Sequence, residues 1–159
     1  MSAIATFTKL PKASVEALRA AAIPKRRLFG APKDLYWDFI ERHGEEVANY
    51  RWSGYVMAAV IPYLTDKHGM AFSSEMADIG SFLCEKRQSS FIPFTLTDKE
   101  KYLQQLGQEF PESELRDYYN NLFGANESDI GSAMRDGIAA LKQALGALDG
   151  DSFVLLHIG

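Results

Sequence analysis

The sequence predicts an α+β fold: a predominantly helical single domain around a small sheet that pairs the N-terminal and C-terminal strands. Two observations support this fold class. Residues 4–10 and 152–159 are extended, apolar-rich segments, and helical periodicity dominates the chain between them. The last segment is apolar on both faces, which requires a neighbouring strand and helices that cover it. The first strand is the expected partner.

The first half of the chain is divided by its periodicity and its turn residues. A helix over 14–22 follows the first strand, a proline-containing connector covers 23–32, and a second helix ends before Gly44. Residues 45–64 combine a charged start with a dense apolar run, which predicts a further, more buried helix. Pro62 is expected to end or kink that helix.

The second half continues with short helices. After a turn at 65–69, the spacing predicts a helix over about 74–86. Pro93 biases its neighbours away from helix, so 89–96 is expected to be an extended loop. Thr97 and Glu100 have capping-box spacing, which predicts a helix from there to about Phe110.

Two more helices precede the last strand. One covers 111–123 and is closed by Gly124. In the other, apolar residues recur every three or four positions and form a continuous stripe: Ile130, Met134, Ile138, Leu141, Leu145 and Leu148. Gly131, Gly137 and Gly146 in the same segment each cost up to about 1 kcal/mol relative to alanine. We expect close approach to the sheet or to another helix to offset this cost, unless some of these glycines break the helix.

Composition indicates a folded protein with a core of its own. The 159 residues are 47% hydrophobic and 24% charged, and a chain of this length buries about 68–70% of its unfolded surface. We expect one domain spanning 1–159. Cys84 is the only cysteine, which favours a reducing compartment. The first residues lack secretory-signal features, and the apolar stretch 55–64 is too short for a membrane helix. We expect a cytoplasmic protein.

Charge argues against a nucleic-acid partner. With 17 basic and 21 acidic residues, the net charge is −4, so a nucleic-acid surface would need a concentrated basic patch. The basic cluster at 24–27 is too short and isolated for that role. It is expected to be a solvated loop, with an electrostatic contact to an acidic partner or a phosphate as the alternative.

Chemistry-bearing residues show no metal or catalytic spacing. The three histidines are far apart in sequence, and Gly44, directly after His43, breaks the spacing that places two ligands on one helical face. Cys84 has no feature of a reactive thiol beyond one neighbouring lysine, which indicates a buried, unreactive side chain. We expect no metal, no cofactor and no catalytic residue.

His157 falls on the same face of the last strand as Phe153 and Leu155, so we expect helices to cover it. Two interpretations remain open. The imidazole is a neutral group hydrogen-bonded in or near the core, or it lines a ligand pocket together with Tyr55 and Tyr63.

The segment 36–63 is unusually rich in aromatic residues, more than one helix face can bury. Trp37 and Trp52 lie off the strongest apolar stripes, and tryptophan is a frequent interface anchor. Carboxylates are interspersed among the aromatic residues or precede them: Asp34, Asp38, Glu41, Glu45 and Glu46. These residues predict a protein-binding surface; the alternative is a packed core with a charged rim.

The pattern at the two chain ends resembles the YfbM-like family, small bacterial proteins of unknown function. It consists of the first strand with its short helix, the segment Tyr36-Trp-Asp-Phe39, and a long last helix running into Phe153-Val-Leu-Leu-His-Ile-Gly159. The resemblance implies an α+β single domain without an established enzyme activity. Similar small acidic proteins often serve as immunity proteins, which bind and neutralise a toxin delivered between bacteria.

The sequence therefore predicts a non-enzymatic bacterial binding protein, most specifically an immunity protein. Its acidic and aromatic surface would cover a cognate protein toxin or another basic protein partner. The alternative is a small-molecule-binding or enzymatic α+β domain with a pocket near His157.

Overall fold

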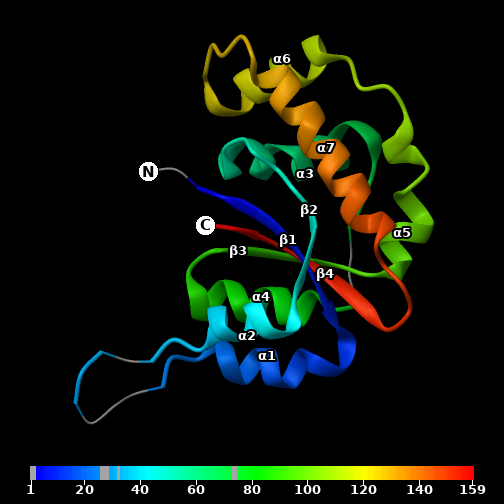
Figure 1. Cartoon of the computed structure of the whole chain (residues 1–159). Helices are drawn as coiled ribbons and strands as arrows, with labels where there is room; N and C mark the ends of the chain where they lie inside the picture. Colours follow the sequence, from blue (N-terminus) through cyan, green and yellow to red (C-terminus); the bar gives the residue numbers. More distant parts are fainter. Residues whose placement is uncertain (1–2, 26–28, 32, 73–74) are drawn as a thin grey trace.

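A computed structural model describes residues 3–25, 29–31, 33–72 and 75–159. It contains a sheet of four antiparallel strands in the order β2-β1-β4-β3 (Figure 1). The strands are β1 (Ala5–Pro11), β2 (Glu45–Ala48), β3 (Ser90–Phe94) and β4 (Ser152–Ile158). Ala5 faces Ile158 and Pro11 faces Ser152, so the terminal strands pair along their whole length. The predicted α+β fold with paired terminal strands is confirmed.

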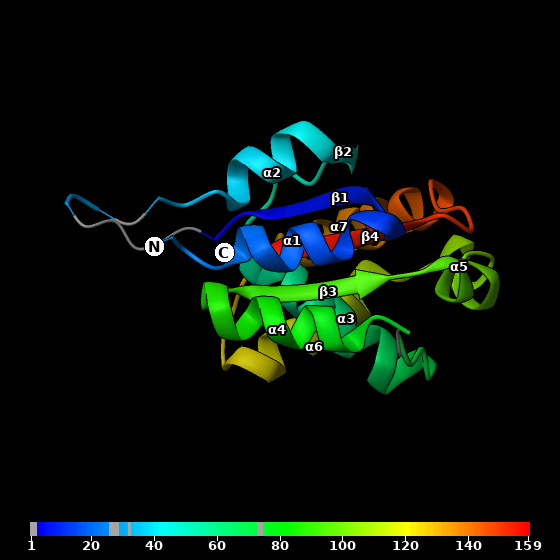
Figure 2. The same cartoon turned by 90° about the horizontal axis from the view of Figure 1, so that it is seen from below.

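Helices cover both faces of the sheet. On one face, the lower one in Figure 1, lie α1 (Val15–Ala22), α2 (Tyr36–His43) and α4 (Ala77–Arg87). On the other lie α3 (Gly54–His68) and α7 (Ile130–Gly146), with α5 (Leu96–Tyr102) and α6 (Glu112–Phe123) packed beside α7. Figure 2 shows the first group from its own side, with α1 and α4 in front of the strands. Single 3-10 turns at Lys12–Ser14 and Gln105–Gly107 link elements.

Alternation along the strands gives each sheet face its own core. Phe7, Val154 and Leu156 pack with the α3 and α7 side. Phe153 and Leu155 belong to the core on the α1, α2 and α4 side. Because β4 is central in the sheet and covered on both faces, its apolar run is buried on both sides, as the sequence predicts.

The prediction of one helix over 45–64 is wrong at both ends. Residues 45–48 form the edge strand β2, and α3 begins only at Gly54, where Ser53 accepts a hydrogen bond from the Tyr55 N–H at 3.3 Å. The helix then passes through Pro62 and ends at His68, so the turn expected at 65–69 is its last turn. The carbonyl that Pro62 leaves without a donor belongs to Ala58, on the exposed side of α3, where water can reach it.

Residues 90–94 are a strand rather than the expected loop. Pro93 is compatible with β3 because this strand lies at the edge of the sheet, where a missing N–H is tolerated. Cys84 of α4 is partly rather than fully buried, and its Sγ accepts a hydrogen bond from the Phe91 N–H at 3.2 Å.

The capping box lies two residues earlier than predicted. Asp98 accepts a hydrogen bond from the Thr95 N–H at 2.9 Å, whereas the Thr97 hydroxyl donates to Glu75 at 3.0 Å. The helix that follows, α5, ends at Tyr102 rather than near Phe110. Spacing alone admits both caps, and the one with the buried carboxylate forms.

Two of the α7 glycines lie where another element approaches closely. A Cβ at Gly131 would collide with the backbone of Glu112, and a Cβ at Gly137 would lie 2.9 Å from Val60 Cγ2. Gly146 has no neighbour within 4 Å of that position. Close packing therefore accounts for the first two glycines and not for the third. Among the described residues, no helix is long and apolar enough to span a bilayer.

Candidate functional site

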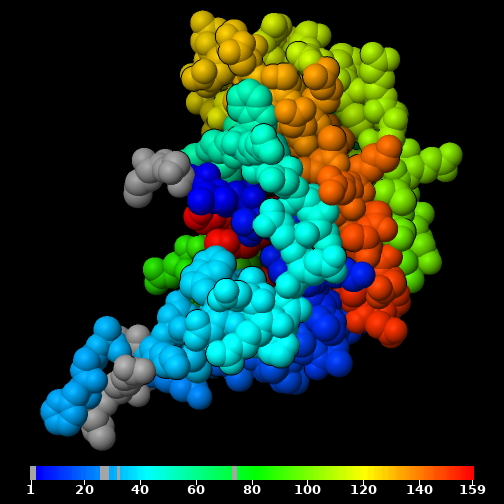
Figure 3. Space-filling model, in the orientation of Figure 1, coloured from blue at the N-terminus to red at the C-terminus, as the bar shows by residue number. Residues whose placement is uncertain are grey.

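The side chains predicted to bind a partner are all exposed. They lie on α2 and the segment before it, on β2, and on the segment 49–53 that follows. In Figure 3 these elements, coloured light blue to teal, form a continuous band across the visible surface. The residues are Asp34, Trp37, Asp38, Glu41, Glu45, Glu46 and Trp52.

The Trp37 side chain packs against other rings on one side and is exposed to solvent on the other. It follows Tyr36, which is buried, and the two rings meet edge to face at 4.9 Å between centroids. The Trp37 ring also meets the His157 imidazole edge to face, with ring centroids 5.3 Å apart. Half of the side chain, 50%, remains exposed. A fixed, half-exposed indole is the form that interface anchors take, because little side-chain entropy is left to lose on binding.

Carboxylates lie on α2, the helix of Trp37, and on the strand β2 that follows it. Asp38, Glu41, Glu45 and Glu46 have no ion-pair partner within 4.0 Å in the described part of the chain. We call these carboxylates and Trp37 the acidic edge. Its unpaired charges create a local negative field that attracts a basic surface.

The register of β2 brings one cation close to the acidic edge. Glu45 pairs with Lys9 across the strands, but the Lys9 ammonium donates to Asp149 at 3.1 Å instead. The Glu45 carboxylate is therefore left available for an external cation.

Strand β2 lies at the edge of the sheet. It pairs with β1 on one side, and no other strand of the described chain pairs with its outer side. An outer strand edge is a site where an extended segment of another protein can add to the sheet. Its shortness and its glutamates oppose uncontrolled pairing, so an added strand would need complementary charge.

Asp34 has a structural role that distinguishes it from the other predicted acids. Both its oxygens accept from the Arg87 guanidinium, at 2.9 and 2.7 Å, and Oδ1 also accepts from the Tyr36 N–H at 3.0 Å. Arg87 in turn lies 4.7 Å over the Tyr36 ring. The hydrogen bonds from Arg87 hold the pKa of Asp34 below its usual range. Asp34 therefore fixes the start of α2 and adds no free charge to the surface.

Trp52 lies on the other side of the sheet from Trp37. Its Nε1 donates to Asp136 Oδ2 of α7 at 2.9 Å, and both residues line a depression of about 400 Å³ next to Arg51 and Gln143. The structure therefore does not bring the two tryptophans into one patch, although the band of α2, β2 and 49–53 connects them.

His157 lies on the same face as Phe153 and Leu155, under α2 and α4, as the alternation predicts. Its ring stacks on Phe91 with centroids 4.6 Å apart and meets Trp37 at its edge. Burial, with a smaller contribution from the Arg87 charge, lowers the pKa of His157. The imidazole therefore lies between the rings of Phe91 and Trp37 and supports the position of Trp37.

The proposed ligand pocket of His157, Tyr55 and Tyr63 does not assemble. Tyr55 is exposed on α3, where it lines an open depression of about 730 Å³ together with Ile158 and Gly159. Tyr63 is fully buried in the core on the α3 and α7 side, across the sheet from His157. The three side chains share no cavity.

Tyr63 instead belongs to a hydrogen-bonded network of polar side chains that the sequence did not reveal. The Tyr63 hydroxyl donates to Glu114 Oε1 at 3.0 Å and lies 3.1 Å from His68 Nε2, while His68 Nδ1 lies 3.1 Å from the Gln108 amide. Burial and the Glu114 carboxylate raise the pKa of Tyr63. The members come from separate parts of the chain, so no local motif marks them.

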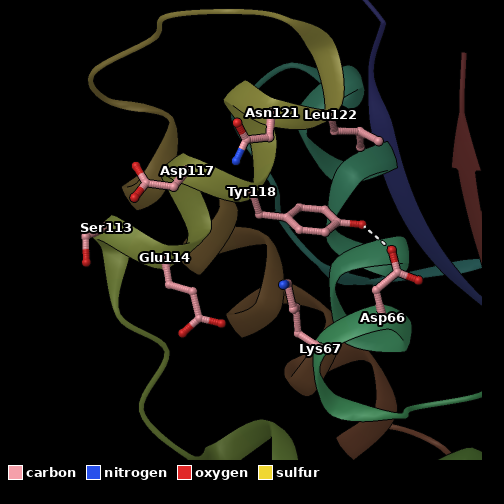
Figure 4. A pocket seen from close by; sticks show the side chains of 8 residues that line it. All are labelled: Asp66, Lys67, Ser113, Glu114, Asp117, Tyr118, Asn121 and Leu122. Atoms are coloured by element: carbon pink, nitrogen blue, oxygen red, sulfur yellow. Dashed lines mark hydrogen bonds between the residues drawn. The ribbon is translucent and has the colours of Figure 1, made fainter.

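Next to this network of side chains, residues of α3 and α6 line a depression of about 700 Å³. Figure 4 shows Tyr118 reaching from α6 to Asp66 on α3, a hydrogen bond of 2.7 Å. Burial, the hydrogen bond to Asp66 and its charge together raise the pKa of Tyr118 to about 12. These contacts tie the two helices together. Within the described residues, no group of three or more His, Cys, Asp and Glu side chains is arranged to hold a metal ion.

Comparison with known proteins gives no relative: no family model matches the chain, and no curated protein or solved structure is similar to it. Its function is therefore inferred from the geometry of its own residues.

Proposed function

We propose that this protein is a non-enzymatic binding module that uses its acidic edge to bind a basic surface of a partner protein. The observation that carries the proposal is the half-exposed Trp37 together with unpaired carboxylates on the same helix, α2, and on the edge strand β2 that follows it. The carboxylates would steer a basic partner and fix its orientation, and the indole would supply buried contact area.

The most specific form of this proposal is an immunity protein. Such a protein inhibits its toxin by covering a surface, which requires complementary charge and shape and no catalytic group. Proteins that act on nucleic acids carry basic surfaces that contact phosphates. An acidic edge on a protein of net charge −4 is complementary to a toxin of that kind.

The first experiment identifies the partner and measures its affinity. The tagged protein is used to capture partners in its native host, and the captured protein is purified for binding kinetics at low and physiological salt. We expect the Glu45→Lys/Glu46→Lys double variant to lower the association rate by about tenfold or more at low salt, because steered association depends on such charges.

A matched control separates the acidic edge from overall charge. Glu100 and Glu109 are exposed and lie outside the acidic edge. The Glu100→Lys/Glu109→Lys variant changes the net charge equally and should leave the association rate within about twofold. Trp37→Ala should speed dissociation by about thirtyfold, as for an interface anchor of about 2 kcal/mol. Trp52→Ala should have little effect.

The immunity function has its own readout. Cells that express the captured partner should stop growing, and coexpression of this protein should restore growth. The acidic-edge double variant should restore it less well than the control variant. Equal association rates for the two charge variants would refute the acidic edge as the binding site, and a partner that is not toxic would refute the immunity function alone.

A further inference from the structure

A groove lies between α1 and α2 and has a volume of about 330 Å³. Its α1 wall consists of small side chains, Ala17, Ala20 and Ala21, and its α2 wall includes Leu35 and Phe39. Ala17 and Ala20 are exposed although they face the groove, so nothing in the described chain fills the space above them. The volume is within the range of small-molecule sites, about 300–1,000 Å³.

One end of the groove carries two lysines that face each other. Lys25 and Lys33 form an isolated antiparallel bridge, each backbone N–H donating to the other's carbonyl at 3.1 Å. Like charges directly opposite each other across such a bridge are destabilising. Neither ammonium group has an ion-pair partner in the described residues. An anion held between them would remove this repulsion.

Two side chains further along the groove, Asp38 and Arg42, have opposite charges, although they form no ion pair within 4.0 Å in the described residues. They are four residues apart on α2, which places them on the same helical face. The uncompensated positive charge is therefore concentrated at the lysine end, and the apolar walls extend away from it. Arg26 and Arg27 follow Lys25 in sequence but lie outside the described residues, and the site does not include them.

We propose that this groove binds a single-chain amphiphile with an anionic head group, of the class of medium-chain fatty carboxylates. The carboxylate lies between Lys25 and Lys33, and the alkyl chain runs along the alanine side of α1 against Phe39. The wall from Leu35 to Arg42 is about 10 Å long at the helical rise per residue, which suits a medium-length chain. A bare inorganic anion would leave the apolar walls unoccupied, and a cationic amphiphile would meet the lysines.

Titration calorimetry of the intact protein with octanoate, decanoate and dodecanoate, each below its micelle concentration, tests the proposal. Affinity should rise with chain length by up to about fourfold per buried methylene until the groove is full. Inorganic phosphate tests the head group alone, and dodecylammonium tests the chain with the opposite charge. Both should bind at least about tenfold more weakly than dodecanoate, because each lacks one of the two matched features.

Two variants place the ligand in the groove. Ala20→Phe fills it from the exposed face of α1 and should abolish binding, whereas Ala139→Phe makes the same change at an exposed position of α7 and should not. Ala17→Phe provides a second filling variant, and circular dichroism verifies that each variant is folded. Lys33→Gln should weaken dodecanoate binding about threefold to fivefold, and Lys142→Gln, on α7, should not change it.

Several outcomes would overturn the proposal. They are unchanged dodecanoate affinity in both folded filling variants, equal affinity for dodecanoate and dodecylammonium, and no binding to the wild-type protein. Retention of the protein on phosphatidylglycerol vesicles without binding of free dodecanoate would also overturn it, because the same head-group chemistry would then be recognised only in a bilayer.

Discussion

Breaking the ion pair between Asp34 and Arg87 should destabilise the protein and loosen α2. The pair fixes the start of the helix that carries Trp37, and the Arg87 side chain is only 12% exposed. Replacing Asp34 therefore leaves a nearly buried guanidinium without its anion. Asp34→Asn removes the charge but keeps a side-chain oxygen for the Tyr36 N–H, and Asp34→Ala removes both.

The contribution of this ion pair to stability can be estimated from the exposure of its two side chains. Hydrogen bonds to charged groups contribute about 1.5–3 kcal/mol, and exposed ion pairs about 0.2–1 kcal/mol. Arg87 is 12% exposed and Asp34 42%, so their pair lies between these limits. We expect Asp34→Asn to lower the free energy of unfolding by about 1–2 kcal/mol, or a Tm decrease of about 2–8 °C. Asp34→Ala should cost about 1 kcal/mol more through the lost acceptor.

Urea unfolding of a double-mutant cycle with Arg87→Met measures the coupling directly. The exposed pair Arg116 and Asp117, 42% and 63% exposed, is the control and should show a coupling below about 1 kcal/mol. Because Arg87 lowers the pKa of Asp34, the contribution should be present above about pH 4 and disappear as the pH falls through the lower folded-state pKa. A coupling no larger than that of the control pair would refute this account of how α2 is held.

Three further substitutions test close packing, helix propensity and the burial of His157. Gly137→Ala should destabilise the protein by about 1–2 kcal/mol, because the new Cβ would lie 2.9 Å from Val60 Cγ2 in the core. Gly146→Ala should stabilise the protein by about 0.5–1 kcal/mol, because alanine has the higher helix propensity and its Cβ would meet no neighbour within 4 Å. The urea midpoints of the two variants should therefore move in opposite directions. Burial lowers the pKa of His157 from 6.5, so the folded state disfavours the imidazolium. Its contribution to stability should be present above about pH 6.5 and diminish as the pH falls toward the folded-state pKa. His157→Phe keeps an aromatic ring against Phe91 and should remove this part of the pH dependence; an unchanged pH profile of unfolding would contradict it.

The residues that local pattern places correctly are those whose structure depends on their own segment. The stripe from Ile130 to Leu145 gives α7, and alternation along β4 puts His157 on the face of Phe153 and Leu155. Exposure of the acidic edge was also predictable, because charged side chains next to an amphipathic helix remain in water. The same rules extended the helix α3 to include 45–48, because the glutamates Glu45 and Glu46 favour a helix over a strand by intrinsic propensity.

Tertiary contacts decided the features on which function depends. Residues 45–48 become a strand because β1 offers them a partner, with Phe7 opposite Ala48. The Trp37 ring contacts His157 on one side of the sheet, whereas Trp52 donates to Asp136 of α7 on the other side. The two tryptophans are therefore separated. Tyr63 meets Glu114 across 51 positions of sequence, which no local window contains.

The sequence by itself determined the α+β class, the pairing of the two chain ends, the principal helices and the acidic, aromatic character of the segment that forms the candidate site. These follow from hydrophobic periodicity and charge, which are properties of neighbouring residues. Only the tertiary structure decided which carboxylates remain unpaired, since Asp34 and Asp38 look equivalent until Arg87 is placed beside the first of them. Ion pairing depends on distances between segments remote in sequence, and the fold sets those distances.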